Sequence, residues 1–191
     1  PCYRNILSAL DLEAVEIMTG PDTHYQPTLA ALEALEGLID GLILASPSNP
    51  TGSMLSPEDF GAISDWCQQK GVRLISDEIY HGLTYGTPET TAAAINDDAF
   101  VINSFSKYFS MTGWRVGWMV VPENMIRSLE RLQGNMTICS PAVSQVAALG
   151  ALSATDELEA LKAGYRRNRT VLRDALTAGG ISEVSAPDGA F

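Results

Sequence analysis

Residues 41–52, Gly-Leu-Ile-Leu-Ala-Ser-Pro-Ser-Asn-Pro-Thr-Gly, join a short apolar run to a polar turn. A run of this length that is apolar throughout is typical of a buried strand, and the prolines and the final glycine are typical of a rigid turn. Similar apolar runs occur at residues 72–76, 99–103 and 116–121. Amphipathic stretches alternate with these runs, which predicts an α/β fold wound around a mainly parallel sheet.

The stretch after the first turn predicts a helix with both ends marked. Ser56 is a good N-cap, Pro57 suits the first helical position, and Lys70-Gly71 is a typical C-terminal signal. We expect further helices near residues 122–133, 141–152 and 156–178. The apolar residues of all four helices recur at helical spacing, so we expect each helix to turn one face toward the core.

Composition excludes several classes of function. Twelve basic residues stand against 23 acidic ones, and the net charge of −11 argues against a surface for nucleic acid or anionic membranes. Apolar runs never reach the 18 residues that would suggest a membrane span. The three cysteines lack the spacing of a metal site or a disulfide framework, so we expect no metal and a cytoplasmic location. Cys67 lies in the apolar stripe of the predicted helix 57–70 and is expected to be a core residue.

Polar side chains follow the first two predicted strands. Asn49 lies in the turn after residues 41–45, and Asp77 follows residues 72–76, with Tyr80 three positions later. In wound α/β sheets, ligands bind beyond the carboxyl ends of the strands, so one pocket could collect these groups. A buried carboxylate is costly without a cationic partner, and we therefore expect Asp77 to face a positive group.

The third strand is followed by a lysine among phosphate-binding groups. Lys107 is close in sequence to the hydroxyl groups of Ser104 and Ser106 and to the guanidinium of Arg115. Hydroxyl and guanidinium groups suit a phosphate, and a lysine amine suits an aldehyde. An aldehyde and a phosphate are the two reactive ends of one cofactor.

At this point the chain resembles the fold-type I pyridoxal-phosphate enzymes, and among them the class I/II aminotransferases that include aspartate aminotransferase. Four motifs occur in the family's order. They are Asn49-Pro-Thr-Gly52, Asp77-Glu-Ile-Tyr80, Ser104-Phe-Ser-Lys107 and Met111-Thr-Gly-Trp-Arg-Val-Gly117. The resemblance implies the cofactor-binding large domain of that fold, a three-layer sandwich around a mainly parallel sheet, incomplete at both ends.

The resemblance also implies roles for individual residues. The catalytic residues would be Lys107, which forms a Schiff base with pyridoxal 5'-phosphate and moves a proton, together with Asp77 and Tyr80. The implied cofactor contacts are Asp77 at the pyridine nitrogen, Asn49 and Tyr80 at the 3′ oxygen, and Ser104, Ser106 and Arg115 at the phosphate. His24 and His81 lie outside these motifs.

The same resemblance sets expectations for the rest of the molecule. Residues 1–153 would be part of the large domain, and residues 154–191 would be a bridging helix and the start of a small domain. The stacking aromatic would lie upstream of residue 1 and the substrate arginine beyond residue 191, so we expect an internal fragment that is inactive alone.

The implied reaction is transfer of an amino group between an amino acid and a 2-oxo acid by a ping-pong route, in a full-length homodimer. A carbon–sulfur lyase or another pyridoxal-phosphate enzyme on the same scaffold is an alternative. An aminotransferase-like regulatory domain is a second alternative.

Overall fold

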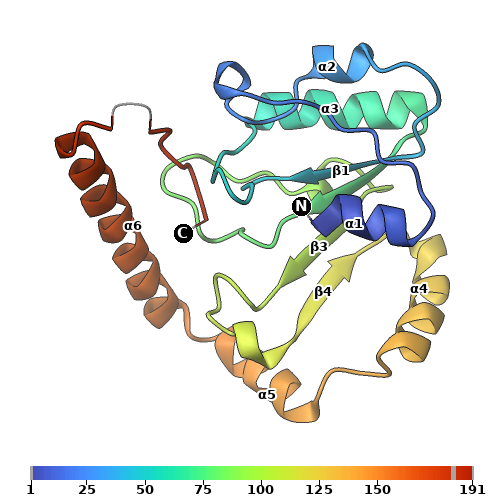
Figure 1. The fold of residues 1–191 in the computed structure, drawn as a ribbon. Helices are drawn as coiled ribbons and strands as arrows, with labels where there is room; N and C mark the ends of the chain where they lie inside the picture. Colours follow the sequence, from blue (N-terminus) through green and yellow to red (C-terminus); the bar gives the residue numbers. More distant parts are fainter. Residues whose placement is uncertain (1, 182–183, 191) are drawn as a thin grey trace.

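A four-stranded sheet forms the centre of the molecule (Figure 1). The computed structural model describes residues 2–181 and 184–190. Strands β1 (Gly41–Ala45), β2 (Arg73–Asp77), β3 (Phe100–Ser104) and β4 (Gly117–Val120) lie in this order. The first three are parallel and β4 is antiparallel to β3. The predicted α/β fold around a mainly parallel sheet is confirmed.

Helix α3 (Pro57–Lys70) begins and ends where its terminal residues predict. The Ser56 side chain accepts a hydrogen bond from the Asp59 N–H at 3.0 Å, which satisfies one of the donors left over at a helix start. Gly71 ends the helix in the left-handed conformation, with φ +69°, and its N–H bonds back to the last turn. The helix boundaries are therefore set locally, by residues that are adjacent in sequence.

The core lies between α3 and one face of the sheet. Phe60, Ile63 and Cys67 from α3 pack with alternate residues of β1 and β2, and α2 (Leu29–Glu33) adds Leu32. The opposite face of the sheet is only partly buried. On that side lies α1 (Cys2–Ala9), which reaches the end of β2 through Tyr3.

The prediction that Cys67 is a core residue is confirmed, since its side chain is fully buried. Burial raises the pKa of its thiol to about 11, so at pH 8 only about one molecule in a thousand carries the reactive thiolate. We expect iodoacetamide at pH 8 to alkylate the exposed Cys2 and Cys139 in the native protein, and to reach Cys67 only after denaturant is added. Peptide mass mapping with and without denaturant checks this; equal alkylation of Cys67 in both conditions would contradict its burial.

The prediction that the later helices each turn one face toward the core is wrong in large part. Helices α4 (Glu123–Met136), α5 (Ala142–Ala151) and α6 (Thr155–Ala178) are all present. Yet α4, every residue of which is described, buries none of them, and α6 buries only Leu158. Figure 1 shows why, because these helices run around the outside of the sheet and away from the layer that α3 covers. Their amphipathic pattern is real, but most of their apolar residues stay exposed in the described part of the chain.

Three connections contain single 3-10 turns, at Pro21–Thr23, Ala92–Ala94 and Thr112–Trp114. The second of them stands between β2 and β3, where a βαβ unit would have a helix. The suggested strand entry at residues 181–184 includes residues 182 and 183, which lie outside the described residues. Within the described part of the chain, no helix is both long enough and apolar enough to span a membrane.

Candidate active site

The carboxyl edge of the sheet gathers the predicted site residues. Asp77 ends β2 and Ser104 ends β3, so both lie at this edge. Because β4 runs antiparallel to β3, its first residue, Gly117, pairs with Ser104. Arg115, two positions before Gly117, is thereby returned to the edge from which the chain left after β3.

Asp77 makes two hydrogen bonds at the end of β2. One carboxylate oxygen accepts the N–H of Ile79 at 3.1 Å, which fixes the turn, and the other accepts the phenol of Tyr3. Burial, together with the hydrogen bond to the Asp77 carboxylate and its charge, raises the pKa of the Tyr3 phenol. Both of these donors are neutral groups, so the positive partner expected for Asp77, which a bound ligand can also supply, stays a prediction.

Tyr3 is a site residue that the sequence analysis missed. The structure brings Tyr3, 74 residues away in sequence, to Asp77. The stacking aromatic expected upstream of residue 1 stays a prediction. The signal was the aromatic residue at the start of the chain. Nothing local indicated that α1 would pack beside the end of β2.

Asn49, Tyr80 and Lys107 meet although they come from three different strand exits. The Asn49 side-chain amide donates to the Tyr80 phenol oxygen at 3.1 Å. The ammonium of Lys107 lies 5.3 Å from the centroid of the Tyr80 ring, a cation–π distance. The buried ring of Tyr80 therefore carries an amide at its hydroxyl end and an amine over its face.

The two serines contact one another, and Arg115 lies near them on the same loop. Ser104 Oγ donates to Ser106 Oγ at 2.9 Å and accepts the Ser106 N–H at 3.0 Å. The hydroxyl of Thr112 donates to the Ser106 carbonyl at 2.7 Å, and Arg115 donates to the Thr112 carbonyl at 2.9 Å. The exposed guanidinium of Arg115 bonds to this loop backbone rather than to either serine.

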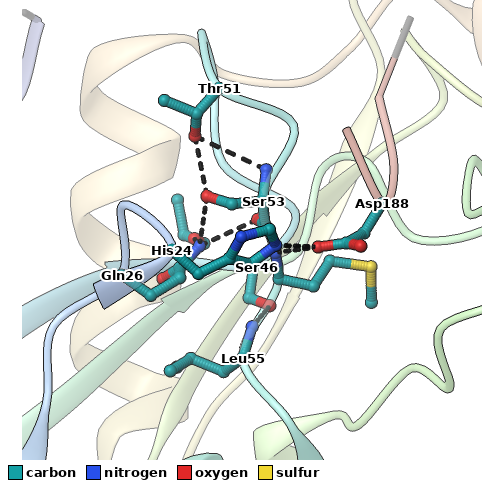
Figure 2. Close-up of polar contacts among 9 residues, drawn as sticks. His24, Gln26, Ser46, Thr51, Ser53, Leu55 and Asp188 are labelled. Carbon is teal, nitrogen blue, oxygen red and sulfur yellow. Dashed lines mark hydrogen bonds and ion pairs between the residues drawn. The ribbon is translucent and has the colours of Figure 1, made fainter. Parts of the chain in front are cut away.

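The turn that carries Asn49 is fixed by a polar network behind it (Figure 2). The buried Gln26 amide donates to the Ser53 carbonyl at 2.8 Å, and the Thr51 and Ser53 hydroxyl groups are 2.7 Å apart. At the base of the turn, the Leu55 N–H donates to Ser46 Oγ at 3.1 Å. The position of Asn49 is therefore set by residues that never touch it.

Residues 184–190 return from α6 and dock on the same turn. The Asp188 carboxylate accepts the Met54 N–H at 3.1 Å and lies 2.6 Å from His24 Nε2, as Figure 2 shows. The backbone N–H groups of Asp188 and Gly189 both donate to the Gly52 carbonyl at 2.9 Å. We call residues 187–190 the clasp, because they join the end of the described chain to the Asn49 turn.

Gly52 is required for this docking. Its φ is +67°, and a Cβ there would lie 2.4 Å from Pro187 Cβ and 2.7 Å from the Gly189 carbonyl oxygen. Gly71 has nearly the same φ, +69°, but a Cβ there would meet nothing within 4 Å. The two glycines therefore differ in steric contact and not in backbone conformation.

We expect Gly52→Ala to lower the free energy of unfolding by about 1–3 kcal/mol more than Gly71→Ala does, the usual cost of overpacking. The left-handed strain is common to both variants and cancels in this comparison. Urea denaturation of the full-length protein measures the difference. Equal losses in the two variants would show that the clasp does not press on Gly52.

The predicted site residues line neither of two hollows on the surface of the described part of the chain. These hollows, of about 450 and 250 Å³, lie near Asp97 and near Thr28. The site is thus defined by its polar groups. A carboxylate, an amide, a phenol, an amine, two hydroxyl groups and a guanidinium are together suited to an aromatic ring with an aldehyde and a phosphate.

Comparisons with known proteins identify relatives of the chain along its whole length. Residues 1–191 match the family described as Aminotransferase class I and II. The valine–pyruvate aminotransferase of Mycobacterium tuberculosis is 50% identical over all of this chain and 50% of its own length. An aspartate aminotransferase of Streptomyces avermitilis is 35% identical over 93% of this chain and 45% of its own length.

Solved structures agree with these relatives. A crystal structure of an aminotransferase from Mycobacterium tuberculosis superposes on the whole chain with a TM-score of 0.96 at 49% identity, and the match covers 50% of that structure. A mutant aspartate aminotransferase from Thermus thermophilus gives a TM-score of 0.91 at 29% identity over 99% of this chain and 51% of its own. The chain spans about half the length of the curated relatives it matches. Because the family matches residues 1–191 and the relatives share its fold, this chain belongs to the aminotransferase class I and II family.

Proposed function

We propose that the protein is a pyridoxal-phosphate-dependent aminotransferase. It would move an amino group between an amino acid and a 2-oxo acid by a ping-pong mechanism, with Lys107 as the residue that forms the Schiff base to the cofactor. The observation that carries the proposal is the position of the Lys107 amine, 5.3 Å from the Tyr80 ring, which itself accepts a hydrogen bond from Asn49. Family membership supports the same function.

The residues of the cluster divide into three tasks. Asp77 would place its negative charge at the ring nitrogen, where a carboxylate favours the protonated form. Asn49 and Tyr80, whose side chains already contact one another, would hydrogen-bond the 3′ oxygen. Ser104, Ser106 and Arg115 would hold the phosphate, and this task needs the Arg115 side chain to turn from the Thr112 carbonyl. The bound cofactor supplies an electron sink, while these residues orient it and set its charge.

Lys107 would also carry out proton transfer. A lysine amine positioned beside the reacting carbon can take up a proton and return it at a neighbouring atom, which is general acid–base catalysis. Its attachment to the loop 104–116 fixes where that amine can reach, because the Lys107 carbonyl accepts the Ser110 N–H at 2.9 Å.

The substrate and the assembly are extensions of the same proposal. We propose an amino acid and a 2-oxo acid as the substrate pair, a homodimer in the full-length protein, and a cytoplasmic location. Residues 1–153 would contribute the cofactor-binding domain, and residues 154–191 would begin a second domain.

Covalent attachment of the cofactor tests the proposed role of Lys107. The full-length protein is incubated with pyridoxal phosphate, reduced with borohydride and digested, and the phosphopyridoxyl group is located by peptide mass. We expect the label on Lys107 and not on Lys70, at the end of α3, or on Lys162, within α6. Label spread over all lysines, or none, would refute the assignment of Lys107.

A further inference from the structure

His81 stands between the two loops that carry Tyr80 and Asn49, and the family motifs do not include it. Its Nε2 lies 3.1 Å from the Ser46 carbonyl oxygen, three residues before Asn49. Its Nδ1 lies 3.3 Å from a carboxylate oxygen of Glu78. The His81 ring thus bridges the exit of β2 and the exit of β1, directly beside the residue whose phenol contacts Asn49.

Both partners of this bridge are shielded from solvent. The side chain of Glu78 is 3% exposed and that of His81 is 14% exposed. The second carboxylate oxygen of Glu78 accepts the Ser76 hydroxyl at 3.0 Å and the Ala92 N–H at 2.8 Å. Every contact of the Glu78 carboxylate is therefore with a donor or with the His81 ring, which is what a buried ionised carboxylate requires.

The bond to Ser46 assigns one proton of the ring. A carbonyl oxygen can only accept, so Nε2 must carry a proton to bond Ser46. The other nitrogen, Nδ1, lies 3.3 Å from a carboxylate oxygen of Glu78, whose second oxygen already accepts two bonds. The ring is therefore tied to the exit of β1 by a hydrogen bond and lies against the Glu78 carboxylate at the exit of β2.

We propose that His81, bonded through Nε2 to the Ser46 carbonyl and lying against the Glu78 carboxylate, is a positioning residue that sets the contact between Tyr80 and Asn49. The tie to Ser46 limits how far the Asn49 turn can move from β2. A second bond stiffens the other side, because the Leu83 N–H donates to the Tyr80 carbonyl at 3.0 Å. His81 touches neither substrate nor cofactor; it acts through the geometry of its neighbours. Only the cofactor readouts below rest on the proposed function.

Two variants separate the effect of the His81–Ser46 bond from the effect of the Glu78 charge. His81→Phe keeps a planar ring but removes both ring nitrogens, so the Ser46 carbonyl and the Glu78 carboxylate lose their partner. Glu78→Gln keeps the bridge, because the glutamine amide can donate to Nδ1 of a neutral ring while Nε2–H still bonds Ser46. Arg127→Met is the matched control, since it breaks an exposed ion pair with Glu130 that has the same three-residue spacing.

In the apoprotein, two measurements are independent of the cofactor. We expect nitrogen NMR of the wild type to show a proton on Nε2 of His81. A crystal structure of His81→Phe should show the 3.1 Å contact between Asn49 and Tyr80 lost. An unprotonated Nε2 would overturn the bond to Ser46, and an unchanged contact would overturn the positioning role. If His81→Phe does not fold, His81→Asn serves for the same measurements.

With pyridoxal phosphate, we expect His81→Phe to bind about tenfold more weakly than wild type, the scale of one buried hydrogen bond left unmade. The pH midpoint of the absorbance of the bound cofactor should also shift, since Tyr80 and Asn49 would no longer hold the 3′ oxygen together. Glu78→Gln and Arg127→Met should bind within about twofold of wild type. If His81→Phe binds pyridoxal phosphate with the affinity and the pH midpoint of the wild type, the positioning role of His81 is refuted. If the wild type itself does not bind pyridoxal phosphate, the proposed function is refuted, and the apoprotein measurements alone decide the role of His81.

Discussion

Lys107→Ala in the full-length protein is expected to remove borohydride-dependent labelling and to lower transamination by about 10²–10⁴-fold, the range for loss of a positioned general base. Loss of the covalent attachment adds to this effect, because the amine that bonds the aldehyde is the same group. Alanine removes the ammonium from the face of the Tyr80 ring but leaves the backbone bond from the Ser110 N–H to residue 107 in place. The loop should keep its shape while the chemistry is lost.

The matched control is Lys70→Ala. Lys70 lies in the last turn of α3 and is exposed, so its loss should leave both activity and labelling at the wild-type level. Rates are measured by the amino acid formed from a 2-oxo acid, and the label by peptide mass. A Lys107→Ala enzyme within tenfold of wild type would show that another amine attaches the cofactor.

Asp77→Asn is expected to lower kcat by about 10²–10³-fold, which corresponds to about 3–4 kcal/mol and lies within the usual cost of breaking a buried ion pair. The change is selective because the asparagine carbonyl can still accept the Ile79 N–H that now bonds the carboxylate. The turn after β2 is retained, while the negative charge that favours a protonated ring nitrogen is lost. Activity and the absorbance of the bound cofactor should therefore change without loss of stability.

Asp65→Asn provides the control for Asp77→Asn. Asp65 is an exposed residue of α3, so the same change of one carboxylate to an amide should affect neither activity nor absorbance there. Urea denaturation of both variants tests whether the fold is intact. A large loss of stability in Asp77→Asn, with kcat unchanged in the folded fraction, would make Asp77 a structural residue.

The sequence predicted those features that neighbouring residues determine. The strands at Gly41–Ala45 and Arg73–Asp77 are recognisable because each is a short apolar run, and α3 because Ser56 and Gly71 mark its ends. Asn49, Asp77 and Lys107 were found because each follows a strand, where wound sheets bind ligands. The position of each residue directly after a predicted strand was enough to select it as a candidate.

What the sequence missed depends on partners far along the chain. The contact of Tyr3 with Asp77 spans 74 residues and that of His24 with Asp188 spans 164. The apolar stripes of α4 and α6 correctly predicted helices, yet periodicity says only that a face exists and not what covers it. No role was predicted for His81, because a histidine next to a motif has no pattern of its own.

The clasp has a consequence for the order in which the protein folds. Asp188 reaches Met54 across 134 residues, so the Asn49 turn receives its last hydrogen bonds only when nearly all of the described chain has left the ribosome. Contacts of such long sequence separation form slowly, because a large loop must close before they stabilise anything. The sheet and α3 can form earlier from neighbouring segments. In a nascent chain that ends before the clasp, Asp77 would therefore lie on a formed strand and Lys107 on the loop after β3, while the turn that bears Asn49 would still lack the hydrogen bonds of the clasp.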